Sequence, residues 1–312
     1  MRDNVIENRL PVLTHPLLIV VLPAYNEGKY IGRAIASLRR QSWVDFAVLI
    51  TDNGSTDETE SIGRAAEKED ARFHYFRHPA NLGAIGNFNF GRRATESPYF
   101  MWMGSHDMIA ADFLERHLAA LQGDRRLSLS YAHTGWIDEN DELFMTTPSS
   151  RLEALPRTAI GRYLASASRL SECTAINNVL RRSFMDDMDL ENVAGADHIM
   201  LSHLAFRGPV NCIAEPLYFR REQLEKRDDY MLRMTGIAGL KKDRVPLVSS
   251  YSNDLGNLLQ GNPFKHLACA AVRIIIERRY SIETAGFVAF THYKLTKAYR
   301  IMMKYLNKVS HR

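Results

Sequence analysis

An apolar run ends abruptly at polar residues in the stretch Tyr99-Phe100-Met101-Trp102-Met103-Gly104-Ser105-His106-Asp107-Met108. Its apolar part is too short for an isolated helix and follows Ser97-Pro98, which predicts a strand buried on both faces. Residues 111–121 then carry apolar side chains at helical spacing, so a helix is predicted directly after the strand. Ligands of open α/β sheets bind where strands end and helices begin. His106 and Asp107 therefore stand where a divalent cation or a phosphate would be held.

Strands and helices alternate in the residues before this stretch. Aliphatic runs at 17–22 and 46–51, and a shorter apolar segment at 73–76, predict three further strands. Apolar residues recur at helical spacing from Tyr30 to Leu38, which predicts a helix between the first two strands. This alternation over the first 120 residues indicates an α/β fold with a mainly parallel sheet and right-handed crossovers.

The composition indicates a globular protein and excludes several classes. With 312 residues and 46% hydrophobic content, the chain can form one large α/β domain or two modest ones. Its 40 basic and 36 acidic residues give a net charge of only +4, which argues against a nucleic-acid partner. The three cysteines lie far apart without Cys-x-x-Cys spacing, which argues against zinc and against a disulfide framework.

The scattered cysteines fit a reducing cytoplasm, and the apolar residues predict neither a secretion signal nor a membrane span. Residues 1–16 are treated as an N-terminal extension, and they lack the apolar region of a secretion signal. No stretch reaches 18 uninterrupted apolar residues, so no transmembrane helix is expected.

The turn after the first strand excludes two common nucleotide folds. A dinucleotide-binding fold would place Gly-x-Gly-x-x-Gly there, whereas this chain has Pro23-Ala24-Tyr25-Asn26-Glu27, and no Walker lysine loop occurs. A nucleotidyltransferase is also disfavoured, because no glycine-rich basic loop follows the strand.

Four separated motifs occur in an order that resembles family-2 glycosyltransferases. They are Pro23-x-Tyr25-Asn26-Glu27, the turn Asp52-Asn53-Gly54-Ser55-Thr56-Asp57, Asn81-x-Gly83, and the strand that ends at Asp107. The resemblance spans residues 17–222 and implies a GT-A (Rossmann-like) fold, with a nucleotide-sugar half to about residue 120 and an acceptor half after it. It also implies transfer of a sugar from a nucleotide-sugar donor with inversion. Residues 223–312 are then expected to form a linker or lid and a helical region.

The resemblance assigns a set of residues to the nucleotide-sugar. Tyr25 would stack on the base and Glu27 would accept from ribose hydroxyls, although core packing is an equal alternative for Tyr25. Asn53 replaces the second aspartate that the family usually has after Asp52, and its amide both donates and accepts, so uracil cannot be assumed. The remaining predicted contacts are Pro23, Asp52, Asn81, Gly83, Asn87, Ser105 and Arg220. A plain surface role is an equal alternative for Arg220.

The expected metal site departs from the family pattern. The family usually has a run such as Asp-x-Asp-Asp where this chain has Gly104-Ser105-His106-Asp107, so only Asp107 clearly corresponds. By the resemblance, Asp107 would hold the Mg²⁺ or Mn²⁺ that neutralises the leaving diphosphate. His106 would favour Mn²⁺ if it is a ligand, and a hydrogen-bonded structural role for it is about as well supported.

The predicted catalytic base is Asp197. It precedes an apolar helical pattern at residues 199–205 and resembles the carboxylate that takes the proton of the acceptor hydroxyl. The alternative for Asp197 is a helix cap. His198 is expected to be a structural neighbour.

Residues 284–312 predict a basic amphipathic helix. They contain six Lys or Arg residues and no Asp or Glu, and one face carries Lys297, Arg300, Lys304 and Lys308. Three settings remain open for this helix: packing on its own domain, an anionic membrane surface at the inner face of the cytoplasmic membrane, or a homodimer contact.

Together these patterns predict an inverting glycosyltransferase. By family analogy its acceptor is a glycan or lipid-linked glycan in bacterial surface polysaccharide assembly. The alternative is a protein of the same fold that binds a nucleotide-sugar but has lost catalysis, which the altered metal motif favours.

Overall fold

The computed structural model describes residues 16–148, 152, 154–169, 173–185, 188–191, 193, 195–222 and 244–284. The chain divides into two compact units, Met1–Asp243 and Arg244–Arg312. The predicted basic helix with Lys297, Arg300, Lys304 and Lys308 lies outside the described residues. Within the described ranges, every helix is too short or too polar to cross a bilayer.

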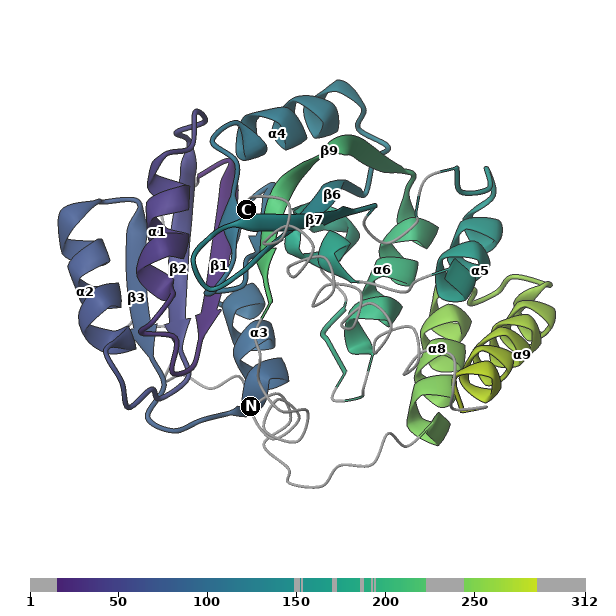
Figure 1. The fold of residues 1–312 in the computed structure, drawn as a ribbon. Helices are drawn as coiled ribbons and strands as arrows, with labels where there is room; N and C mark the ends of the chain where they lie inside the picture. Colours follow the sequence, from purple (N-terminus) through teal and green to yellow (C-terminus); the bar gives the residue numbers. More distant parts are fainter. Residues whose placement is uncertain are drawn as a thin grey trace, which may run out of the picture. The chain divides into compact units, whose positions relative to one another are not determined.

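One mixed sheet forms the centre of the first unit (Figure 1), in the order β3-β2-β1-β4-β8-β6-β9-β5 with β7 paired to β6. Its first half is parallel and consists of β3 (Phe73–Arg77), β2 (Phe46–Asp52), β1 (Leu18–Ala24) and β4 (Tyr99–Trp102). Its second half mixes directions and consists of β8 (Val179–Arg181), β6 (Leu129–Ile137), β9 (Val210–Arg221), β5 (Met108–Ile109) and β7 (Leu143–Thr147).

Helices cover both faces of the parallel half. Leu18, Val20 and Leu22 of β1 share one core cluster with apolar side chains of α1 (Ile31–Arg39), α2 (Thr59–Glu69) and α4 (Phe113–Gly123). The opposite face receives α3 (Gly83–Arg93) at close range, because a Cβ on Gly91 would lie 2.3 Å from Cγ1 of Val21. Every residue of β1 and β2 is buried, as predicted for strands covered on both faces.

Both α-helices and short 3₁₀ helices accompany the second half of the sheet. Helix α5 (Ala159–Arg169) packs on α6 (Ala196–Arg207), and the 3₁₀ helix η1 (Thr174–Asn177) contacts β4, β6 and α6. A second 3₁₀ helix, η2, covers Arg182–Phe184. Through η1, α6 is thus linked to β4, the strand that precedes His106 and Asp107.

The helix predicted for residues 111–121 is confirmed as α4, but the short strand before it was not predicted. Met108 and Ile109 form β5 because they pair with Phe219 and Tyr218 of β9. β6 runs without a break from Leu129 to Ile137, because β9 pairs along most of its length. Both β5 and β6 therefore depend on pairing with a strand about 80 to 110 residues further along the chain, which a local pattern does not contain.

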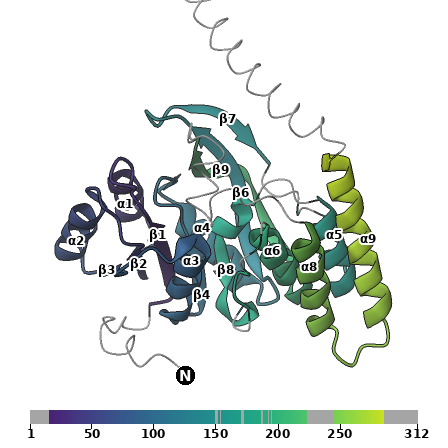
Figure 2. The same cartoon turned by 90° about the horizontal axis from the view of Figure 1, so that it is seen from below.

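The second unit contains α8 (Arg244–Leu258) and α9 (Lys265–Thr284), which run side by side (Figure 2). Leu255, Leu259, Val272 and Ile276 supply buried side chains of this helix pair.

Candidate functional site

The loops after β1 and β2 meet at one edge of the parallel sheet. Ala24 and Asp52 are register partners, so both strands end at the same level. The amide of Asn26 donates to Oγ of Ser55 at 2.9 Å, and the amide of Glu27 donates to Oγ1 of Thr59 at 2.9 Å. Side chains of the second loop therefore fix the backbone of the first.

Asn53 fixes the loop after β3. Its Nδ2 donates to Oδ1 of Asn81 at 2.7 Å and to the carbonyl of Gly83 at 3.2 Å, while its Oδ1 accepts from the amide of Leu82 at 2.8 Å. Gly83 has a φ of 74°, a left-handed conformation that glycine adopts without strain. Asn53, which stands where the family usually has an aspartate, is 2% exposed, and the hydrogen bonds of its side chain hold this loop in place.

Asp52 and Asn87 are buried supports behind the loops. Oδ1 of Asp52 accepts from the amide of Ser55 at 2.8 Å and Oδ2 accepts from the hydroxyl of Tyr75. Burial, followed by this hydrogen bond, raises the pKa of Tyr75 far above its ordinary value. Nδ2 of Asn87 donates to the carbonyl of Thr51 at 2.8 Å, and its Oδ1 lies 3.2 Å from Nε2 of His78.

The other residues predicted to contact the nucleotide-sugar differ in solvent exposure. Pro23, Glu27 and Ser105 are buried, whereas Tyr25 is half-buried and Asn81 is exposed. Arg220 is half-buried, with its guanidinium 5.2 Å from the ring centroid of Trp136. Tyr25, Asn81 and Arg220 thus retain surface that a ligand could contact.

The imidazole of His106 lies between two carboxylates. Its Nδ1 is 3.0 Å from Oε1 of Glu27, and its Nε2 is 3.7 Å from Oδ1 of Asp107. Since a carboxylate can only accept, Nδ1 carries a proton, and in the neutral imidazole the lone pair is then on Nε2, which is the tautomer that metal ions bind. The separation of Nε2 and Oδ1 is longer than a hydrogen bond and short enough for one ion to bind both atoms at about 2.1 Å. The two residues therefore fit a divalent cation.

Asp107 is held firmly, at 4% exposure. Its Oδ2 accepts from the hydroxyl of Tyr218 at 2.7 Å, and its Oδ1 accepts from the amide of Arg221 at 2.9 Å. Burial, followed by the charge of Asp107, raises the pKa of Tyr218 well above its ordinary value. A Cβ on Gly104 would lie 2.4 Å from Oδ2 of Asp107. A carboxylate at residue 104, where the family has one, therefore requires Asp107 to move.

Arg221 is a site residue that the sequence did not single out. Its Nε donates to the carbonyl of His106 at 2.9 Å, and its terminal nitrogens reach the carbonyl of Asp138 and the carboxylate of Asp141. Its guanidinium also lies 4.6 Å from the ring centroid of Tyr30. The sequence offered two adjacent arginines at the end of one strand, and only the register of β9 decides which of them turns toward the His106 loop.

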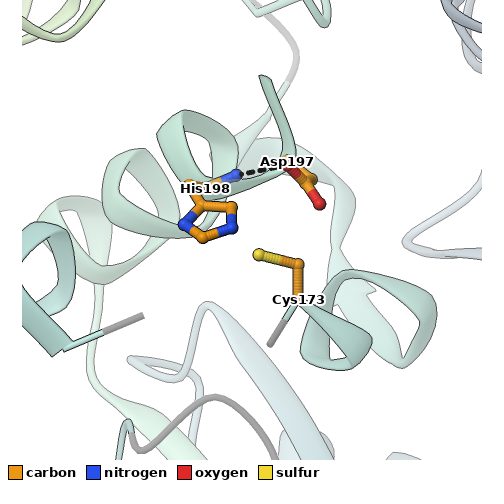
Figure 3. Close-up of side chains that lie close together, drawn as sticks. All are labelled: Cys173, Asp197 and His198. Carbon is orange, nitrogen blue, oxygen red and sulfur yellow. Dashed lines mark hydrogen bonds between the residues drawn. The ribbon is translucent and has the colours of Figure 1, made fainter. Parts of the chain in front are cut away.

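Asp197 lies in the first turn of α6. The N-cap position before it is Gly195, whose φ of 88° is left-handed. Oδ1 of Asp197 accepts from the amide of His198 at 3.0 Å. The side chains of Asp197, His198 and the buried Cys173, which precedes η1, each bring a potential ligand atom within 4.8 Å of the others (Figure 3). Sequence spacing argued against zinc, but the packing of η1 on α6 brings one cysteine to a histidine and an aspartate distant in sequence.

Comparisons with known proteins give a matching family and several relatives. The family model described as Glycosyl transferase family 2 matches residues 19–188. An uncharacterized glycosyltransferase of Haemophilus influenzae is 28% identical over 141 residues, which are 45% of this chain and 56% of the relative. Validoxylamine A glucosyltransferase of Streptomyces hygroscopicus is 29% identical over 110 residues, which are 35% of this chain and 26% of the relative. The chain thus spans about half or less of the length of these curated relatives.

Two solved structures share the fold. TarS of S. aureus in complex with UDP-GlcNAc has a TM-score of 0.55 at 15% identity, covering 85% of this chain and 91% of that chain. The mannosyltransferase PcManGT from Pyrobaculum calidifontis, in complex with GDP-Man and Mn²⁺, has a TM-score of 0.50 at 13% identity, covering 93% of this chain and 81% of that chain. The predicted GT-A fold is confirmed by these likenesses.

Proposed function

We propose that this chain, which belongs to glycosyl transferase family 2, transfers a sugar from a nucleotide-sugar donor to an acceptor hydroxyl with inversion. One observation carries the proposal: the loops after β1, β2 and β3 are joined by hydrogen bonds, and His106 and Asp107 lie beside them after β4. Curated relatives are named glycosyltransferases, and solved structures of this fold bind UDP-GlcNAc or GDP-Man.

The donor would lie on the exposed residues of this edge. Tyr25 offers a half-buried ring for the base, and Asn81 offers an exposed amide. Pro23, Asp52, Asn53, Gly83, Asn87 and Ser105 would act mainly by shaping the surface behind the donor. Arg220 would approach the diphosphate from β9.

His106 and Asp107 would hold a divalent cation, Mg²⁺ or Mn²⁺. The bound ion supplies charge compensation for the leaving diphosphate. The imidazole favours Mn²⁺ over Mg²⁺. Glu27 orients the imidazole through Nδ1, and Arg221 and Tyr218 keep the loop and the carboxylate in place.

Asp197 would act as the general base. The acceptor hydroxyl oxygen attacks the anomeric carbon, the bond from that carbon to the diphosphate oxygen breaks, and the hydroxyl proton passes to the Asp197 carboxylate. Attack opposite the leaving group inverts the anomeric configuration. Support comes from its position: Gly195 takes the N-cap, and among the described residues the Asp197 carboxylate accepts one hydrogen bond, from the adjacent amide.

The acceptor and location extend the proposal by family analogy. A glycan or lipid-linked glycan of a surface polysaccharide remains our proposed acceptor, and a cytoplasmic site of action would match it. Membrane contact or dimerisation through residues 284–312 stays a prediction. A second candidate is nucleotide-sugar binding without catalysis, which Gly104 favours because the family's first carboxylate is absent.

A screen over UDP- and GDP-sugars tests the proposal. Thermal shift would first identify the donor that stabilises the chain, and release of its nucleoside diphosphate would then be measured with acceptor mimics, with and without Mn²⁺. We expect metal-dependent transfer to at least one mimic. Stabilisation by a donor without turnover on any mimic would favour the binding-only alternative, and no stabilisation by any donor would contradict both.

A further inference from the structure

The group of Cys173, Asp197 and His198 combines three different metal-binding side chains. Each offers one ligand atom, and these atoms lie within 4.8 Å of one another. Figure 3 shows the thiol approaching from the start of η1, while the carboxylate and the imidazole come from the first turn of α6. Cys173 is 9% exposed, whereas Asp197 and His198 are half-buried, so the group is closed on one side and accessible on the other.

This donor set differs from the His106–Asp107 pair in its preference for metals. Zn²⁺ binds thiolate, imidazole and carboxylate at about 2.0–2.3 Å, and three such ligands with a fourth, open position are common in zinc sites that are not purely structural. Mg²⁺ prefers oxygen ligands and does not select a thiolate. The three ligand atoms need to move only slightly toward one another to bind one zinc ion. The positive end of the α6 dipole repels a cation, and the negative charges of the thiolate and the carboxylate would offset this repulsion.

We propose that Cys173, Asp197 and His198 bind Zn²⁺, and that the occupied site is inactive. The second half of this proposal rests on the proposed function, because it requires Asp197 to be the base. A zinc ion on the carboxylate occupies the lone pair that would otherwise take the acceptor proton. Zinc would thus inhibit transfer at a site separate from the cation held by His106 and Asp107, and an excess of Mn²⁺ would not relieve the inhibition.

Cobalt binding tests the site without any measurement of activity. The purified full chain, freed of metal, would be titrated with Co²⁺, whose thiolate charge-transfer absorption reports a Co–S bond and whose visible bands report tetrahedral geometry. We expect both signals, and Zn²⁺ should abolish them. Cys173→Ser should remove the charge-transfer band, while the matched variants Cys212→Ser and Cys269→Ser should keep it. A wild-type titration without this band, or a band that persists in Cys173→Ser, would overturn the site.

A second variant is needed because Cys173 is buried, so Cys173→Ser could lose the charge-transfer band by failing to fold. His198→Gln alters a half-buried position and should weaken Co²⁺ and Zn²⁺ binding by about tenfold or more while the melting temperature stays near wild type. Unchanged affinity in this variant would also overturn the site.

Inhibition is measured separately on the transfer reaction. Cys173→Ser should keep its turnover without zinc, and its half-inhibitory Zn²⁺ concentration should rise by about tenfold or more. Zinc that binds through Cys173 without slowing wild-type transfer would overturn the inhibitory half of the proposal. If Asp197→Asn retained full turnover while the Co–S band was present, the role of Asp197 as base would fail but the metal site would stand.

Discussion

In two places the chain has a histidine and an aspartate adjacent in sequence, and the two pairs differ in how firmly their side chains are held. In the pair His106–Asp107, both carboxylate oxygens accept hydrogen bonds and the imidazole is oriented by Glu27. In the pair Asp197–His198, the carboxylate accepts a hydrogen bond from the amide of His198 in the first turn of α6, and it lies near the thiol of Cys173. In our proposal, the first pair is preorganised to hold a charge in one place, whereas the second takes up a proton or a metal ion.

Residue type alone does not assign a role to a histidine and an aspartate that are adjacent in sequence. His106 and Asp107 are fixed by β9, a strand more than 100 residues away, through Tyr218 and Arg221. Asp197 and His198 receive their neighbour Cys173 through packing of η1 on α6. This proposed division between a holding pair and a reacting pair can be tested by substitutions in each pair.

The largest effect is expected at Asp197. The change Asp197→Asn keeps the shape of the side chain but cannot accept the proton, so turnover should fall by about 10²- to 10⁴-fold. The measurement is the initial rate at saturating donor. Asp112→Asn is the control, because Asp112 also lies at the start of a helix and its side chain is 52% exposed. Full turnover in a folded Asp197→Asn protein would return this residue to a structural role.

The next effect concerns the stability given by Asp107. In Asp107→Ala, the hydroxyl of Tyr218 and the amide of Arg221 lose their acceptor in a buried setting, which should lower the free energy of unfolding by about 3 kcal/mol. Urea denaturation would measure it, and Asp197→Ala should cost much less. Equal losses at the two aspartates would remove the distinction between a held and an open carboxylate.

Glu27 should act through His106. The change Glu27→Gln keeps the side-chain size but removes the charge that fixes the imidazole tautomer, so affinity for Mn²⁺ in the presence of nucleoside diphosphate should fall about 10- to 100-fold. Turnover at saturating Mn²⁺ should change little. Glu142→Gln, at an exposed position, serves as the control. Unaltered Mn²⁺ affinity would argue that His106 is not a ligand.

The buried His117 makes the stability of the fold depend on pH. Turnover measured at acid pH must therefore be corrected for the loss of folded protein. Burial lowers the pKa of His117 from 6.5 to about 3, so the unfolded chain binds a proton that the folded chain does not. Stability is therefore complete above pH 6.5 and falls as the pH drops toward 3, by about 2 kcal/mol at pH 5.

Unfolding of His117→Asn at pH 7 and pH 5 checks this correction. The variant should show less loss than wild type between the two pH values, and an equal loss would exclude His117 as the cause. A fall in turnover that exceeds the loss of folded protein can then be assigned to the site.

The sequence predicted the parallel half of the fold well, because β1, β2 and β4 are continuous apolar runs buried on both faces. It also placed Asp107 and His106 correctly after β4, since strand ends and turn residues are local signals. It missed β5 and the role of Arg221, because both depend on pairing with β9. It could not show that Asn53 would hold the 81–83 loop, since the partners of an amide depend on tertiary structure.

Our central claim is that His106 and Asp107 hold the diphosphate through a cation, whereas Asp197 reacts. Its most direct test is the affinity for nucleoside diphosphate of variants in each pair. Calorimetry with UDP or GDP, whichever stabilises the chain more, would be carried out with Mn²⁺ on wild type, His106→Ala and Asp197→Asn. We expect Asp197→Asn to bind as wild type does and His106→Ala to bind about tenfold more weakly. Weakened binding in Asp197→Asn together with unchanged binding in His106→Ala would contradict the assignment of holding to one pair and reaction to the other.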